Sequence, residues 1–301
     1  MIRLVFAILD VTFLPKIVVN RLVLSIITVF LFTNSGVAGN LQKDSTISFL
    51  PKQKIFPVIF LDPLECQVSG GSYFLSRSES NLSLYSNVCL GLNKPILKVN
   101  GKKFTSEAAF GAATFTQFDL VKKDNGSYLA GLLNNDYKVS LEYSIKSKQN
   151  LFKIRVFHVS SHLGDDYMLR HNDTIPNDKS VNYEQGDITY LKLYHKSYWY
   201  LSVGEIYTKY LFRKRFSCFT GYLLEFKDYR TFSFFTALNV KFFAENNFQP
   251  DCRASIGINC KRENEPIVRI WFEYYNGHLP YSTLDYGRVN WFGFAMWINV
   301  L

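Results

Sequence analysis

After its first forty residues, the sequence lacks any apolar run that approaches the roughly 18 residues needed for a membrane-spanning helix. This absence excludes a helical membrane protein. The sequence also lacks a glycine-rich phosphate loop and any Walker or Rossmann pattern, which removes the common nucleotide-binding folds. These patterns give no reason to expect a cofactor.

Cysteine is scarce: the five cysteines form no CxxC pair and do not cluster with histidine at a metal-like spacing. A zinc site is therefore not expected. Cys66 and Cys89 would be able to pair if the chain is exported to an oxidising compartment. Cys252 and Cys260 share one face of an expected strand, but they lie too far apart along it to form a disulfide.

Acidic residues are outnumbered, with 25 Asp and Glu against 34 Lys and Arg, and the formal net charge is +9. The basic residues are dispersed, and the densest group, Arg213-Lys214-Arg215, stands between two strand-like segments. A nucleic-acid-binding protein gathers its basic residues on one face, so no nucleic-acid partner is expected. A dispersed basic surface suits anionic lipid head groups or an anionic solute.

The first 39 residues resemble a secretory signal peptide. The apolar run from Leu22 to Phe32 follows Lys16 and Arg21, and the small residues of Val37-Ala38-Gly39 come after it. We predict cleavage before Asn40. The alternative is a permanent N-terminal anchor.

Aromatic residues are abundant, with 27 Phe and 19 Tyr, and from residue 107 onward apolar and polar residues alternate with a period of two. This alternation is the pattern of strands with one apolar face. Most of the segments run for ten or more residues, which is longer than globular strands and suits strands that cross a bilayer. We expect ten of them: 107–121, 136–146, 151–163, 187–196, 198–210, 215–227, 231–246, 251–263, 267–276 and 288–301.

The predicted fold class is all-β: an antiparallel transmembrane β-barrel of about 10–12 strands, with a signal peptide and an irregular N-terminal extension. The domains would be a signal peptide over 1–39, a periplasmic extension or plug over 40–106 that adds one or two strands, and an outer-membrane barrel over 107–301. A soluble exported β-sandwich is the alternative.

The last segment alternates up to the end of the chain, although Leu301 stands where outer-membrane barrels usually have Phe. Such a final strand is what the barrel-assembly machinery of the bacterial outer membrane recognises. The expected partners are therefore this machinery and outer-membrane lipids, and the oligomeric state stays open.

The most unusual motif runs from Ser160 to Tyr167 (SSHLGDDY). Together with FGAATFTQFDL at 110–120 and YYNGHLPYSTL at 274–284, it resembles a family of uncharacterised bacterial outer-membrane barrels of unknown function. The resemblance covers most of residues 60–301. It implies the fold and the location, and it implies no activity.

A second resemblance concerns His158, Ser160 and Asn172, which reproduce the spacing of the His-x-Ser dyad and the later Asn of the outer-membrane phospholipase A family. Residues i and i+2 of a strand share a face, so the imidazole can act as general base for the hydroxyl. The Asn would hold the imidazole tautomer. That family follows its serine with Asn-Gly-Arg, whereas Ser161-His162-Leu163 follow here, so the likeness does not extend to the oxyanion and calcium parts of the site.

Two other interpretations of the motif remain. In the first, which we expect, the side chains of His158, Ser160 and His162 form a polar cluster in the lumen. Phe152, Ile154 and Val156 share their parity, so this arrangement requires a bulge. Gly164-Asp165 would then be a turn, with Asp165 or Asp166 hydrogen-bonded to the loop backbone, and Ser161 and Tyr167 would belong to the same polar cluster. In the second, His158, His162 and Asp165 would bind a metal.

The corresponding functions are a structural, binding or narrow-channel barrel and, as the alternative, a phospholipase-like acyl hydrolase.

Overall fold

The structure is a computed structural model that describes residues 45–77, 80–122, 126–171, 182–208, 214–263, 265–280 and 287–299. The predicted signal peptide and the candidate residue Asn172 lie outside these ranges. The described strands beyond Thr46 belong to one compact unit, Ile47–Leu301.

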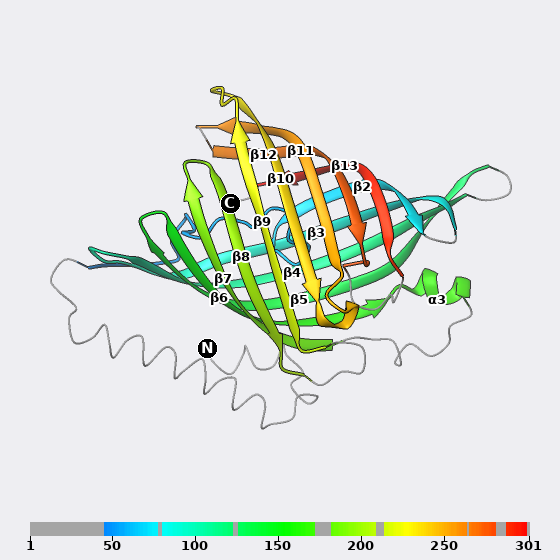
Figure 1. Ribbon diagram of the computed structural model, residues 1–301, viewed down its shortest axis with the longest axis horizontal. Helices are drawn as coiled ribbons and strands as arrows, with labels where there is room; N and C mark the ends of the chain where they lie inside the picture. The colour runs from blue at the N-terminus through cyan, green and yellow to red at the C-terminus, as the bar shows by residue number, and fades with distance from the viewer. Residues whose placement is uncertain are drawn as a thin grey trace. The chain divides into compact units, whose positions relative to one another are not determined.

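Twelve antiparallel strands close into a barrel within this unit, because β3 pairs with both β2 and β4 (Figure 1). They are β2 (Val68–Arg77), β3 (Ser80–Asn100), β4 (Thr105–Lys122), β5 (Tyr128–Ser147), β6 (Asn150–Leu163), β7 (Asn182–Tyr194), β8 (Ser197–Ile206), β9 (Phe216–Phe226), β10 (Phe232–Phe243), β11 (Pro250–Arg262), β12 (Glu265–Gly277) and β13 (Val289–Ile298). A short strand β1 (Thr46–Phe49) also pairs with β3. The predicted barrel is confirmed, and the sandwich is wrong.

Alternation along each strand separates an outer face from the lumen. On β10, Phe234 and Leu238 point outward, while Asn239 points inward and donates to the Tyr200 hydroxyl at 2.6 Å. Large apolar side chains remain exposed on the outer face of nearly every strand, among them Ile154, whereas charged side chains are buried in the lumen. An apolar outside and a polar inside are what a bilayer requires of a spanning barrel.

The lumen is filled by an inner segment, residues 51–67, which contacts strands on several sides of the barrel. Its Asp62 binds Lys241 of β10 at 2.6 Å and Arg155 of β6 at 3.2 Å. Glu65 lies 3.3 Å from the same Arg155 and 3.5 Å from Lys153. Every one of these side chains is less than a tenth exposed, so the segment is held by a buried ionic network.

An aromatic cluster packs beside this network. Phe60 of the inner segment meets the rings of Phe235 and Trp271 at centroid distances of 5.1 and 4.7 Å, both edge-on. Trp291 stacks on Tyr275 with 3.9 Å between ring centroids. Such pairs add stabilisation to the area that they bury.

The segment over 40–106 adds two strands, as the sequence analysis allowed, and the barrel therefore begins before residue 107. Strands β2 and β3 fall inside the predicted extension over 40–106, yet both pair along their length with barrel strands, so the barrel starts at Val68 rather than at residue 107. Their alternation is weak in sequence because small or polar residues such as Gly71 and Asn87 occupy many positions.

Cys66 and Cys89, which export to an oxidising compartment would allow to pair, are both free thiols in this structure. The Cys89 thiol instead donates to the backbone oxygen of Gln67 at 3.0 Å. Cys252 and Cys260 both occupy even positions of β11, on one face as predicted.

The two ends of the barrel differ. At one end, hairpins reverse tightly, with Lys148, His195 and Lys227 in the left-handed conformation that short hairpin turns demand. The β6–β7 connection, which contains helix α3 (Asp165–His171), lies at the opposite end. Among the described residues, no helix is long and apolar enough to cross a membrane.

Candidate active site

Three of the predicted site residues, His158, Ser160 and His162, occupy the outer face of β6. Odd-numbered residues of this strand, such as Arg155 and Val159, are buried toward the lumen. The even-numbered residues Phe152, Ile154 and Val156 form an apolar stripe outside, and His158, Ser160 and His162 continue the same face toward α3. The apolar stripe therefore gives way to polar residues along one strand face.

This orientation overturns two sequence-based expectations. His158, Ser160 and His162 do not point into the lumen, and β6 contains no bulge, because its register with both β5 and β7 runs without a shift. The shared parity with Phe152 and Ile154 marks the lipid side of the barrel. The lumen face of β6 is recognisable by Lys153 and Arg155, which bind the inner segment.

Ser160 lies between two imidazoles on this face. Its hydroxyl is 3.0 Å from Nε2 of His162, and the His162 ring contacts the Tyr137 ring edge-on, with 5.8 Å between centroids. His158 lies two residues before Ser160, a separation of roughly 6.6 Å along a strand. The structure therefore bonds Ser160 to His162, while His158, the other predicted partner, lies next to it on the same face without a hydrogen bond to its hydroxyl.

His158 is held from behind by a carboxylate on the neighbouring strand. Its Nδ1 is 2.9 Å from Glu184 of β7, which is 8% exposed. The Thr208 hydroxyl donates to the same carboxylate and accepts from the Glu184 backbone N–H at 3.0 Å. With Nδ1–H donated to Glu184, Nε2 of His158 carries a lone pair that can accept a proton.

Close packing keeps Glu184 and its strand in place. The backbone N–H of Tyr207 donates to the Glu184 carbonyl at 2.9 Å. The Tyr207 hydroxyl lies over Gly186, where the Cβ of any other residue would come within 2.2 Å of it. Glycine at 186 therefore lets the segment after β8 cover the outer face beside Glu184.

The remaining motif residues support the end of β6 rather than the polar face. Ser161 points into the lumen and donates to the carboxylate of Asp136. Gly164 is required because a Cβ there would meet the backbone oxygen of Leu132 at 2.1 Å. The expected turn is the start of α3, where the Asp166 carboxylate accepts from the Leu132 backbone N–H at 2.9 Å.

Asp165 also lies in the first turn of α3, where an acidic side chain suits the helix dipole. Tyr167 packs against the lumen core. His158, His162 and Asp165 do not form a metal site, because the described residues contain no group of three or more metal-ligand side chains. Asn172 lies outside the described ranges. Behind the His158 imidazole, where the phospholipase resemblance would put an Asn, the structure has the Glu184 carboxylate.

Sequence reasoning missed Glu184 and Thr208. Both follow from strand register: His158 is opposite Glu184 across β6 and β7, and Tyr207 continues that row. The long connection before β7 hides this pairing, because the expected strand began only at residue 187, whereas β7 begins at Asn182. The available signal in the sequence was the acidic residue Glu184, which stands just before the alternating segment 187–196.

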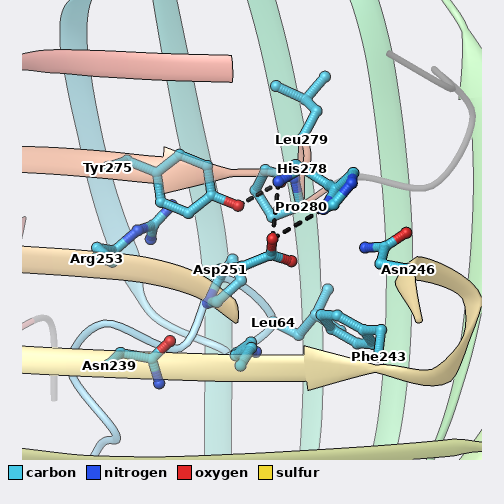
Figure 2. A pocket seen from close by; sticks show the side chains of 12 residues that line it. Leu64, Asn239, Phe243, Asn246, Asp251, Arg253, Tyr275, His278, Leu279 and Pro280 are labelled. Carbon is cyan, nitrogen blue, oxygen red and sulfur yellow. Dashed lines mark hydrogen bonds and ion pairs between the residues drawn. The ribbon is translucent and has the colours of Figure 1, made fainter. Parts of the chain in front are cut away.

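The lumen offers no comparable site among the described residues. At its α3 end, a cavity of about 40 Å³ is lined by residues of the inner segment, β10, β11 and the segment after β12. Figure 2 shows Asp251 binding both the backbone N–H and Nδ1 of His278, each at 2.9 Å. A space of this size holds no more than a few water molecules, so it is too small for a lipid or a sugar.

Comparison with solved structures places the fold among known barrels. Outer-membrane phospholipase A from Escherichia coli aligns over 82% of this chain and 95% of its own, with a TM-score of 0.51 and 10% identity. The Salmonella typhi outer-membrane phospholipase dimer with bound calcium aligns over 83% and 94%, with a TM-score of 0.50 and 8% identity. At this identity the likeness concerns the fold. No curated protein matches the chain.

A closed antiparallel barrel with an apolar outer face is the architecture of bacterial outer-membrane proteins, and this protein is an outer-membrane β-barrel. The model of a family described as proteins of unknown function (DUF1207) matches residues 33–299, and the chain therefore belongs to that family.

Proposed function

We propose that the protein is an outer-membrane acyl hydrolase that cleaves ester bonds of lipids in the surrounding bilayer, with Ser160 as nucleophile. One observation carries the proposal: Ser160 lies on the outer face of β6, between His158 and His162, where the apolar stripe ends. At this level a lipid ester can reach the hydroxyl without leaving the membrane interface. The shared fold with outer-membrane phospholipase A supports the same function.

His158 is the general base in this proposal. A catalytic imidazole must be oriented by a third group, and Glu184 holds Nδ1 of His158 at 2.9 Å. His162 lies on the other side of the hydroxyl. In the tautomer that carries its proton on Nε2, His162 donates this N–H to Ser160 Oγ. The serine proton can then point toward His158. Glu184 stabilises the imidazolium that forms.

The reaction then proceeds in two balanced steps. Ser160 Oγ bonds to the carbonyl carbon of the ester as its proton passes to Nε2 of His158, and the carbonyl oxygen becomes an oxyanion. Collapse breaks the bond to the lipid alcohol, which takes the proton from His158. Water repeats the sequence at the acyl-serine, so fatty acid leaves and Ser160 regains its proton.

The same proposal covers the route to the membrane. Residues 1–39 direct export, and the barrel-assembly machinery inserts the strands into the outer membrane. The basic surface contacts anionic head groups.

The second candidate is a structural or binding barrel without catalysis. The buried ionic network around Asp62 and the packed inner segment favour a rigid barrel. The inner segment fills the lumen, and this argues against the narrow channel that the strand count suggested.

The test is fatty-acid release from glycerophospholipid in mixed detergent micelles by the purified, folded protein. Ser160→Ala should abolish release without unfolding the barrel, because it removes only the attacking oxygen. Ser161→Ala is the matched control: this neighbouring hydroxyl faces the lumen and should be dispensable. A wild-type protein without activity, or a Ser160→Ala variant that retains it, would contradict the proposal.

A further inference from the structure

We infer that the side-chain amide of Asn135 donates a hydrogen bond to the oxyanion formed at Ser160; this inference rests on the proposed function. Asn135 is on β5, directly opposite His162 of β6, and the adjacent outward residue Tyr137 is opposite Ser160. Asn135 therefore stands beside the Ser160–His162 pair, on the side away from the base His158.

Two hydroxyls fix the orientation of this amide. Thr114 and Thr116 of β4 both donate to Oδ1 of Asn135, at 2.7 and 2.9 Å. A carbonyl oxygen has two lone pairs, so both are occupied, and the oxygen cannot be exchanged with the nitrogen by a flip without losing both bonds. The NH2 group is consequently the part of the side chain left to face outward.

The two donors of this NH2 group have no acceptor among the residues that the structure describes. On the membrane side of a barrel, an unpaired polar group is costly unless it serves a ligand or meets water. An amide with a fixed direction and free N–H groups is the kind of donor that stabilises a tetrahedral oxyanion.

The strand geometry permits the contact. Directly opposed residues have Cβ atoms about 4.5–5.5 Å apart and diagonal neighbours about 7–8 Å apart. Asn135 is diagonal to Ser160 and directly opposite His162, so the amide and Nε2–H of His162 approach the same space from two strands. The carbonyl oxygen of an ester attacked by Ser160 occupies that space when the proton leaves toward His158.

Thr114 and Thr116 are positioning residues in this arrangement, because they act through Asn135. Their pairing with β5 places Thr114 opposite Tyr137 and Thr116 opposite Asn135. Loss of either hydroxyl removes one of the two bonds that hold the amide, so it should lower kcat while leaving KM for the lipid unchanged.

The test compares Asn135→Leu with wild type in the fatty-acid release assay. Leucine has a similar size, suits a lipid-facing position and lacks the N–H donors. We expect kcat to fall about 10²–10³-fold, the usual effect of removing one oxyanion donor, with KM and heat-modifiable gel mobility unchanged. Thr114→Val and Thr116→Val should lower kcat by smaller factors.

Asn182→Leu is the decisive comparison. Asn182 of β7 is directly opposite Ser160, but its Oδ1 accepts from the Ser161 backbone N–H at 3.3 Å, which gives it a role at the strand end. We expect this variant to keep wild-type kcat. An active enzyme whose kcat survives Asn135→Leu, or falls with Asn182→Leu instead, would overturn the assignment of Asn135 while leaving Ser160 as nucleophile. If Ser160→Ala itself has no effect, the proposed function fails first.

Discussion

At the scale of single residues, Glu184 connects the polar face to the surrounding fold. Its carboxylate contacts the imidazole of His158 and the hydroxyl of Thr208, and it is almost fully covered. A covered carboxylate on the outer side of a barrel is expensive unless its hydrogen bonds are satisfied. A positive charge that develops on the His158 imidazole would explain this arrangement, because the Glu184 carboxylate beside it would balance that charge.

Replacing Glu184 by Gln tests that role. Glutamine keeps the shape and one hydrogen bond but loses the charge, so kcat/KM should fall roughly 10–100-fold, the equivalent of about 1.5–3 kcal/mol for a hydrogen bond to a charged group. Steady-state kinetics on phospholipid micelles measures the change. Glu205→Gln is the control, since Glu205 pairs with the exposed Arg215 and touches neither imidazole. Equal kinetics for both variants would contradict the role of Glu184.

The residue types of the site were predictable from sequence, but their direction was predicted wrongly. The His-x-Ser-x-His spacing places three side chains on one strand face, and the structure keeps them there. Which face looks outward depends on Lys153 and Arg155, whose charges are balanced by Glu65 and Asp62 some ninety residues earlier in the chain. The parity of Phe152 and Ile154 within β6 already indicated the lipid side, but the carboxylates that balance the inward charges lie far away in the sequence.

At the scale of elements, the inner segment and β6 are joined chiefly through Arg155. This side chain is 2.7 Å from Asp187, 3.2 Å from Asp62 and 3.3 Å from Glu65, and it is 2% exposed. Removal of one partner from a buried ionic group leaves the other charges uncompensated. The inner segment thereby supports the strand that carries Ser160.

Arg155→Ala should therefore destabilise the barrel by about 3–5 kcal/mol. The measurement is the temperature at which the folded, fast-migrating band on an unboiled gel is lost, which should be lower for this variant than for wild type. Arg215→Ala, which removes an exposed partner of Glu205 at the end of β8, should cost no more than about 1 kcal/mol. Comparable melting of both variants would show that the ionic network does not hold the inner segment.

The turn between β9 and β10 gives a pH-dependent contribution. Hydrogen bonds from Lys196 and Lys261 hold the pKa of the Asp228 carboxyl below its ordinary value. A depressed pKa in the folded state means that the stabilisation is present above the unfolded pKa and is lost as the pH falls through the folded one.

We expect Asp228→Asn to lower thermal stability slightly at pH 7, and the difference from wild type to vanish once the pH is below the folded pKa. Melting of both proteins followed across an acid titration measures this. A difference that persists or grows in acid would contradict the predicted sign.

The strands themselves were largely predictable, because each of the ten expected segments overlaps one observed strand from β4 to β13. Period-two alternation survives wherever one face meets lipid. It fails for β2, where Gly70 and Gly71 break the pattern. It also fails for the first part of β7, where consecutive residues are buried because Tyr207 covers the outer face.

At the scale of the whole molecule, the outer surface must match a bilayer. Leu238 lies in the middle of β10 on the outer face, so Leu238→Lys should destabilise the barrel by about 2–4 kcal/mol at bilayer mid-depth. Leu169→Lys in α3 is the control, since that side chain is 77% exposed and lies beyond the strands. Thermal unfolding in lipid vesicles should give a lower melting temperature for Leu238→Lys than for Leu169→Lys. Equal melting temperatures would contradict the assignment of Leu238 to the lipid-facing surface.

A lysine at an inward position such as Asn239 should be poorly tolerated in this barrel. Asn239 faces the lumen, where it is 2% exposed and bonded to Tyr200. The lumen is packed, so a longer side chain has no space there. An inward position in this barrel is a core position.

The central claim is that Ser160 is an activated nucleophile on the membrane face of a folded barrel, and active-site labelling tests it most directly. The folded protein in outer-membrane vesicles is treated with a fluorophosphonate that modifies activated serines, and the adduct is located by tandem mass spectrometry. We predict one adduct, on Ser160, with Ser161 unmodified and with labelling lost in His158→Ala. A folded barrel in which Ser160 stays unmodified, or in which another serine carries the label, would contradict the account.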